Sequence, residues 1–264
     1  MDLGLKGKRA LVTGSTAGIG LAAARALAEE GAQVTINGRT VERVQAARQM
    51  LEREVPGTHL AGVAADLGLA EGCAALCRHV PEVDILVNNV GIFEPKPFEA
   101  IPDEDWLRFF ETNVMSGVRL TRHYLPGMRQ RDWGRIVFVS SESALQIPVE
   151  MIHYGMTKTA QIAIARGVAE SLVGTGVTVN SVLPGPTNSE GVGQFITRLA
   201  ESKGTDAASA EREFFTTARP TSILQRFATP EEVAAMIVYV CSAKASATTG
   251  AALRVDGGVV RAIP

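Results

Sequence analysis

The sequence predicts an α/β fold, with one doubly wound parallel sheet and helices on both of its faces. Short apolar runs alternate with helix-like stretches along the whole chain, at the spacing of repeated strand–helix units. A glycine-rich turn joins the first apolar run to the first helix. No internal repeat or linker divides the 264 residues, and this length fits a single domain.

The first apolar run, residues 9–13, leads through TGSTAGIG (13–20) into an alanine-rich helix that is closed by Gly31. Its glycines are spaced GxxxGxG. Small residues allow the tight turn, the approach of a pyrophosphate to the backbone, and close packing of the helix on the strand. The helix N-terminus offers free N–H groups and a positive dipole end to phosphates. The turn therefore predicts a dinucleotide-binding site.

The second strand, residues 33–37, ends in Asn37, Gly38 and Arg39. NAD-selective sites place an acidic side chain near this point to accept from the ribose 2′-hydroxyl. No acid is present here, and Arg39 is able to bind a 2′-phosphate instead. We therefore expect NADP(H) to be favoured over NAD(H). The alternative is a solvated arginine at a strand end.

Five further apolar runs complete a predicted sheet of seven strands: residues 59–67, 84–88, 135–139, 177–182 and 252–256. Asp66 lies near the end of the first of these runs, and Asn88 to Gly91 end the second. Ligands bind at the carboxyl ends of strands in such sheets, so both are candidate cofactor contacts. A turn-capping role explains either of them equally well.

Two longer segments complete the chain. Residues 103–131 read as one long helix with Asn113 inside it, where asparagine is a mediocre helix former. Residues 188–219 mix glycine, serine and threonine with two short helical pieces, which predicts a substrate lid at the edge of the sheet. A helix from Thr229 onward begins with a cap, a proline and two acids.

Tyr154 and Lys158 are four residues apart at the start of an alanine- and isoleucine-rich helix, so they share a helix face. Lowering a phenol pKa from 10 to near 7 takes ~4 kcal/mol. One positive charge ~4 Å away at an effective dielectric of 20 supplies that much. The pair could therefore move a proton at neutral pH. By itself such a pair is usually just an exposed tyrosine and lysine, so other motifs must support it.

Composition excludes several classes of function. The formal net charge of −2 favours neither a nucleic-acid surface nor a membrane-binding face. Cys73 and Cys77 are near His79, but no second ligand pair follows at zinc spacing, so we expect no metal site. The N-terminus runs into a strand without a signal-peptide core, and no apolar run could span a bilayer. We expect a soluble, cytoplasmic protein.

In their order, these motifs resemble the short-chain dehydrogenase/reductase family over nearly the whole chain. The motifs are TGSTAGIG, NNVG, an asparagine in the next helix, a serine before YxxxK, and a Pro-Gly turn. Ser141 stands thirteen positions before Tyr154, the usual separation in that family. The resemblance implies a single-domain Rossmann fold that transfers a hydride between NAD(P)(H) and a CH–OH carbon, as in 3-oxoacyl-carrier-protein reductase-like members.

The resemblance also implies catalytic roles. Tyr154 would be the acid/base, and Ser141 would orient the substrate oxygen, with Ser143 a weaker candidate. Lys158 would lower the pKa of Tyr154 and hold the nicotinamide ribose. Asn113 would support a water chain from Lys158 to solvent. His153 is expected to border a substrate pocket or an interface rather than to act in catalysis.

The implied cofactor contacts come from the glycine turn, the strand ends and the catalytic helix. They are Gly14, Ser15, Thr16, Gly18, Ile19, Gly20, Asn37, Arg39, Asp66, Leu67, Asn89, Gly91, Tyr154, Lys158, Pro184, Gly185, Thr187 and Ser189.

We expect an NADPH-preferring enzyme that reduces a ketone to a secondary alcohol, or catalyses the reverse, with a 3-oxoacyl thioester as one possible substrate. The alternatives are an NAD-dependent alcohol, sugar or steroid dehydrogenase of the same family and a non-catalytic sensor of the cofactor. Epimerases and dehydratases of the extended family share YxxxK but are longer. Family members are commonly tetramers built through the late helices and the last strand, so a homotetramer is expected.

Overall fold

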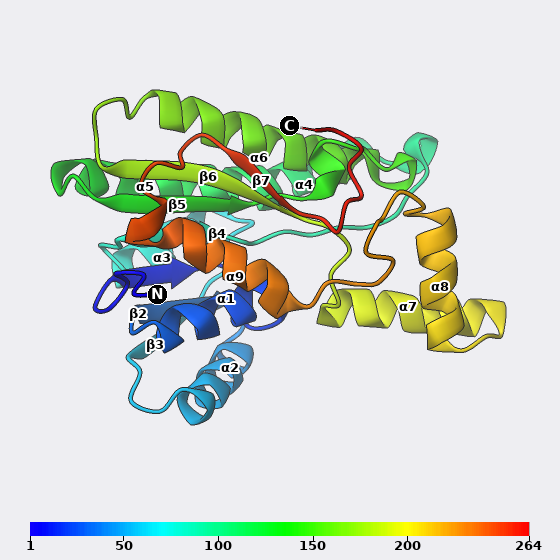
Figure 1. The fold of residues 1–264 in the computed structure, drawn as a ribbon, viewed down its shortest axis with the longest axis horizontal. Helices are drawn as coiled ribbons and strands as arrows, with labels where there is room; N and C mark the ends of the chain where they lie inside the picture. The colour runs from blue at the N-terminus through cyan, green and yellow to red at the C-terminus, as the bar shows by residue number, and fades with distance from the viewer. Residues whose placement is uncertain (264) are drawn as a thin grey trace.

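The computed structural model describes residues 1–263 and places their strands in one seven-stranded, all-parallel sheet (Figure 1). The strand order is β3-β2-β1-β4-β5-β6-β7. Strands β2 and β3 are added on one side of β1 and strands β4 to β7 on the other, so the order of addition reverses between β1 and β4. The predicted fold class is confirmed. The strands are β1 (Arg9–Val12), β2 (Gln33–Gly38), β3 (Leu60–Ala64), β4 (Ile85–Asn88), β5 (Gly134–Val139), β6 (Val177–Pro184) and β7 (Ala252–Val255).

Helices cover both faces of the sheet. One face carries α1 (Gly18–Glu29), α2 (Val41–Glu54) and α9 (Pro230–Cys241), with α1 packed against α9. The other carries α3 (Ala70–His79), α5 (Ser116–Gln130) and α6 (Ile152–Glu170). Shorter helical segments are α4 (Asp103–Phe110) and the 3-10 turns Phe98–Ala100, Glu142–Ala144, Val149–Met151 and Ala243–Ala245.

Successive side chains of each strand point to opposite faces of the sheet, which gives the protein two hydrophobic cores. Val12 of β1 and Val137 of β5 point into the core beneath α1 and α9. Their neighbours Leu11 and Phe138 point into the core beneath α5 and α6. Because successive strand residues face opposite sides, a sheet covered on both faces needs continuous apolar strands. This accounts for the apolar runs in the sequence.

The predicted single helix over residues 103–131 is wrong in one respect. A π-helical turn, Glu111–Met115, interrupts it between α4 and α5. Asn113 lies in this turn, 1% exposed, and its side-chain amide exchanges two hydrogen bonds with the backbone of Ile92. Single π turns occur frequently at functional sites. The turn explains how a poor helix former is accommodated here.

The segment predicted as a lid, residues 188–219, is more ordered than its sequence pattern suggests. It forms α7 (Glu190–Lys203) and α8 (Ala207–Thr217), which stand beyond the end of the sheet in Figure 1. The side chains of Ser189 and Asp206 cap these two helices. A small separate core that includes Phe215 and Phe227 holds the pair together.

Several features of the described residues bear on the function class. Within residues 1–263, no helix is long and apolar enough to cross a membrane. The same residues contain no group of three or more His, Cys, Asp or Glu side chains that could hold a metal ion. The three cysteines are free thiols, and Cys73 and Cys241 are buried.

Candidate functional site

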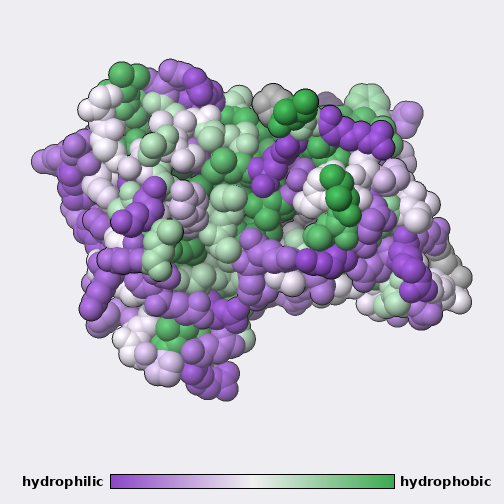
Figure 2. All heavy atoms as spheres, viewed as in Figure 1, coloured by the Kyte–Doolittle hydropathy of each residue, from purple (hydrophilic) through white to green (hydrophobic). Residues whose placement is uncertain are grey.

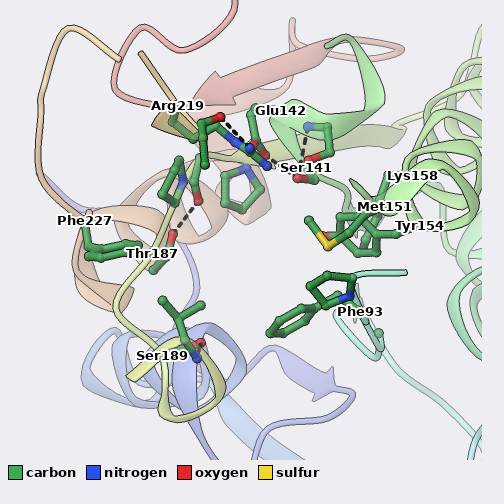
Figure 3. A pocket seen from close by; sticks show the side chains of 18 of the residues that line it. Phe93, Ser141, Glu142, Met151, Tyr154, Lys158, Thr187, Ser189, Arg219 and Phe227 are labelled. Atoms are coloured by element: carbon green, nitrogen blue, oxygen red, sulfur yellow. Dashed lines mark hydrogen bonds and ion pairs between the residues drawn. The ribbon is translucent and has the colours of Figure 1, made fainter. Parts of the chain in front are cut away.

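The carboxyl ends of β4, β5 and β6 open into one cavity of about 460 Å³. Figure 3 shows Tyr154 and Phe93 on one side of it, Thr187 and Phe227 on the other, and Arg219 nearby. The cavity extends to Ile19 in the first turn of α1. The sequence-predicted residues among those lining it are Ile19, Asn89, Gly91, Ser141, Tyr154, Lys158, Pro184, Gly185, Thr187 and Ser189.

Ser15 and Asn37 stabilise the glycine turn through hydrogen bonds to backbone groups. Ser15 donates its hydroxyl to Val12 O at 2.6 Å and its N–H to Asn37 O at 2.8 Å. The Asn37 side chain accepts from Gly14 N and donates to Val63 O at 3.1 Å. Both residues were predicted as cofactor contacts. The structure instead places their side chains, fully buried, in the framework of the turn.

The first turn of α1 provides the phosphate-binding geometry. The helix begins at Gly18, carries no acidic residue in its first turn, and so presents N–H groups and a positive dipole end. Gly14 and Gly18 have φ values of +59° and +55°, the left-handed conformation that glycine adopts without strain. These residues fit the pyrophosphate of a dinucleotide.

Replacing Gly20 by alanine is expected to weaken cofactor binding. The added Cβ would lie 2.4 Å from Asn89 Nδ2 and 2.6 Å from Gly14 O, so the turn must shift. Overpacking of this kind costs about 1–3 kcal/mol, which, if it falls on the bound state, corresponds to about 5- to 150-fold in the Kd for NADPH. Fluorescence titration and thermal unfolding measure the two effects. The matched control is Gly167→Ala in α6, where a Cβ meets nothing within 4 Å, and stability should rise.

Tyr154 and Lys158 lie together on α6, as their spacing predicts. Lys158 Nζ lies 5.6 Å from the centre of the Tyr154 ring. The ammonium donates to Val139 O at 2.9 Å and to Gln161 Oε1 at 3.3 Å. Burial lowers the pKa of Lys158 to about 8. A buried ammonium held by two neutral acceptors is therefore part of the site.

The pKa of Tyr154 differs from the sequence expectation. Burial raises it above the ordinary phenol value, and the nearby carboxylate of Glu142 raises it further. The nearby hydroxyl of Ser141 and the charge of Arg219 act in the opposite direction on the pKa of Tyr154. The expected lowering by Lys158 is not seen: burial dominates the pKa of Tyr154, and the charges that act on the phenol are those of Glu142 and Arg219. Tyr154 is thus held in its protonated form.

Gln161 links the lysine to Asn113, a contact that the sequence analysis missed. Its side-chain amide donates to the main-chain oxygen of Asn113 at 2.5 Å, while its carbonyl accepts from Lys158. The Asn113 side chain meanwhile donates to Thr157 Oγ1 at 3.0 Å. The structure therefore brings Asn113 and Lys158 together through Gln161. The signal was a polar residue on the apolar helix, one turn after Lys158.

Ser141 lies in the cavity at the end of β5, where its hydroxyl donates to Glu142 Oε2 at 2.5 Å. The N–H of Ser143 donates to Ser141 Oγ at 3.1 Å. Arg219 completes this wall of the site by donating to Glu142 Oε1 at 3.0 Å. Sequence reasoning missed Glu142 and Arg219. The glutamate directly after Ser141 was a possible signal, whereas Arg219 comes from the end of the lid.

Among the remaining predicted cofactor contacts, Arg39 and Asp66 are exposed, whereas Thr16 is partly buried and Leu67 is buried. Arg39 is exposed at the end of β2, and Thr16 lies beside Gly38, where its methyl would meet an added Cβ. Asp66 is exposed and accepts from Gly68 N at 3.0 Å, a turn-capping contact. Leu67, in contrast, is buried in the core beneath α5 and α6.

The amide of Asn89 is similarly occupied within the protein, because it donates to Thr13 O and Gly14 O at 2.9 and 3.0 Å. His153 was expected at a pocket border or an interface, and that expectation is wrong. The residue is completely buried, with its ring centroid 4.0 Å from that of Phe109. Burial lowers its pKa.

Comparison with known proteins agrees with the geometry. Residues 8–199 match the sequence profile of the family described as short chain dehydrogenase. The "Uncharacterized oxidoreductase YvaG" of Bacillus subtilis (strain 168) is 51% identical over 263 residues, covering 100% of both chains. The 3-oxoacyl-[acyl-carrier-protein] reductase FabG of Aquifex aeolicus (strain VF5) is 34% identical over 264 residues, covering 98% of this chain and 100% of the relative.

A solved structure matches over the same extent. The crystal structure of L-sorbose reductase from Gluconobacter frateurii, complexed with NADPH and L-sorbose, has a TM-score of 0.94 and 33% identity. It covers 100% of both chains. The profile match and the full-length relatives together confirm the resemblance seen in the motifs: this chain is an oxidoreductase that belongs to the short-chain dehydrogenase family.

Proposed function

We propose that the protein is an NADPH-preferring ketone reductase in which Tyr154 gives a proton to the carbonyl oxygen. The observation that carries the proposal is one cavity containing Ser141, Tyr154 and Lys158 that reaches the first turn of α1. A bound nicotinamide would supply the hydride. The ketone, the hydride and the tyrosine proton together give a secondary alcohol.

The chain's own groups suit the reduction direction. Negative charge develops on the carbonyl oxygen during hydride transfer, and the hydroxyls of Tyr154 and Ser141 are donors that would stabilise it. The raised pKa keeps Tyr154 protonated, which is the form that donates. Lys158 and Gln161 lie behind the tyrosine, where they would return a proton to it through Asn113 and water.

The comparisons support a nicotinamide cofactor and a ketone. The L-sorbose reductase structure was obtained with NADPH and L-sorbose, and L-sorbose is a ketone sugar. The similarity to FabG keeps a 3-oxoacyl thioester as the second candidate substrate. The lid role of residues 188–219 is part of the proposal, since Phe214 and Arg219 of that segment line the cavity.

Preference for NADPH is expected to depend on Arg39. Arg43, in the first turn of α2, is paired with Glu190 at 2.9 Å, whereas no described residue accepts a hydrogen bond from Arg39, which precedes the helix. Charge-assisted hydrogen bonds contribute about 1.5–3 kcal/mol, so Arg39→Asp should lower the NADPH/NADH ratio of kcat/KM by about 10- to 100-fold. Initial rates with both cofactors on a panel of ketones measure this ratio.

The control for charge is Arg48→Asp, because Arg48 lies further along α2 and pairs with Glu52 at 3.2 Å. It should leave the ratio unchanged. Equal kcat/KM values for NADPH and NADH in the wild-type protein would contradict the preference. Absence of turnover on every ketone with either cofactor would contradict the proposed function itself.

The homotetramer remains a prediction. Figure 2 shows apolar side chains across the middle of the face that α9 and β7 occupy in Figure 1, bordered by hydrophilic ones. Tyr239 of α9 is 43% exposed. An exposed apolar surface of this kind suits contact with a second copy of the chain.

A further inference from the structure

The cavity wall beside Ser141 carries a buried ion pair. Glu142 is 5% exposed and Arg219 8% exposed, and Arg219 Nε donates to Glu142 Oε1 at 3.0 Å. Arg219 Nη1 donates to Glu150 Oε1 at 3.2 Å, so two carboxylates share one guanidinium. Figure 3 shows Arg219 and Glu142 grouped next to Ser141.

A contribution to stability is a weak explanation for this buried pair. Removing two charges from water costs several kcal/mol per ion, and apolar replacements of buried pairs are often equally stable or more so. The neighbouring lining residues Phe93, Met151 and Phe227 are apolar. A few polar groups on an otherwise apolar wall are typical of sites that orient a ligand.

The hydrogen bonds around Ser141 indicate what the pair could recognise. The single hydroxyl proton of Ser141 is directed to Glu142 Oε2 at 2.5 Å. When Ser141 turns its proton to a substrate carbonyl, that carboxylate oxygen loses its donor. A buried charged acceptor without a donor is costly. A hydroxyl group on the substrate, close to the carbonyl, would replace the missing donor.

Charge limits the class of substrate further. The cluster of Glu142, Glu150 and Arg219 has two negative charges against one positive charge. A carboxylate or phosphate next to it would be repelled at short range. Within residues 1–263, the hydrogen bonds of Arg219 use Nε and Nη1, which leaves Nη2 as a further donor to an oxygen. A neutral substrate with hydroxyl groups satisfies both sides of the pair.

We propose that Glu142 and Arg219 select a neutral ketone that carries a hydroxyl group next to its carbonyl, such as a hydroxyketone or a ketose. Glu142 accepts from that hydroxyl while Ser141 turns to the carbonyl oxygen, and Arg219 donates to a substrate oxygen from Nη2. This inference rests on the proposed ketone reduction. It favours polyhydroxylated ketones over 3-oxoacyl thioesters.

The test compares 1-hydroxy-2-butanone with 2-butanone, which differ only in the hydroxyl group, and with the anion acetoacetate. With NADPH, the wild-type protein should prefer the hydroxyketone in kcat/KM by about a hundredfold or more, because an unmatched polar site rejects the analogue without the hydroxyl. Acetoacetate should be the poorest substrate. In Glu142→Gln, the preference for the hydroxyketone should fall at least about tenfold.

A second variant separates recognition from folding. In the double variant Glu142→Leu with Arg219→Met, apolar groups of similar size replace the pair. Its Tm should equal or exceed that of the wild type, while the preference for the hydroxyketone is lost. Glu170→Gln is the matched control, because it disrupts the exposed pair between Arg166 and Glu170 on α6. The preference should be retained there.

Equal kcat/KM values for 1-hydroxy-2-butanone and 2-butanone would overturn the selection while leaving ketone reduction in place. A preference that survives in the double variant would also overturn it, and would make the pair a structural contact. Failure to reduce any of these ketones, or any in the wider panel, would instead contradict the proposed function.

Discussion

Replacing Tyr154 by phenylalanine is expected to lower kcat by about a thousandfold, within the range that general acid catalysis supplies. The substitution removes only the hydroxyl group. The ring contact with Phe93, at a centroid distance of 6.4 Å, can remain. Because the cofactor cradle at α1 is untouched, the Kd for NADPH should change only a few-fold. Stopped-flow or steady-state absorbance at the nicotinamide band measures the first quantity, and fluorescence titration the second.

Tyr124→Phe is the matched control. Tyr124 is buried on α5 and donates its hydroxyl to Val80 O at 2.7 Å. It does not line the cavity. Loss of that hydrogen bond should cost about 1 kcal/mol of stability without affecting kcat. If Tyr154→Phe reduces ketones at the wild-type rate, the proton comes from another group and the assigned role is wrong.

The fold could be predicted from the sequence because its signals are local. Each strand is a short apolar run, and its successive side chains point to opposite faces of the sheet. Two adjacent apolar residues such as Leu11 and Val12 therefore already indicate two cores. The helical break at Asn113 was different. A π turn is set by what its side chains bond to, in this case the backbone of Ile92, and that partner lies 21 residues away. The contact of Gln161 with Asn113 is hidden in the same way, because the two residues are 48 positions apart in the sequence.

Part of the candidate site could likewise be predicted from local spacings, and part depends on contacts between distant segments. Ser141, Tyr154 and Lys158 follow fixed spacings along strand and helix, and the structure places them together in the cavity. Arg219 reaches Glu142 only through the path of α7 and α8, which no short pattern specifies. Ser15, in the glycine turn, and Asn37, at the end of β2, are among the predicted cofactor contacts. Their side chains instead satisfy buried backbone groups, a need that only the folded turn reveals.

The stability of the wild-type protein relative to Lys158→Met is expected to rise with pH above about 8. Burial lowers the pKa of Lys158 to about 8 in the folded state, against 10.5 in the unfolded chain. Between these values the unfolded chain binds one more proton than the folded protein, so the free energy of unfolding increases with pH. From pH 7 to 9.5 the relative gain should be about 2 kcal/mol. Urea unfolding of both proteins at the two pH values measures it.

Below pH 8 both states bind the proton, so the difference between the two proteins should be flat there. Lys244→Met, which removes an exposed ammonium, controls for the titration of surface lysines. Lys158→Met should also lose most of its turnover, because the proposed mechanism uses this ammonium to hold the ribose and to return a proton to Tyr154. A protein that gives up stability at neutral pH to keep this ammonium buried is one in which Lys158 is retained for chemistry. A stability difference that falls with pH would mean that Val139 O and Gln161 Oε1 hold the charged form more strongly than burial disfavours it.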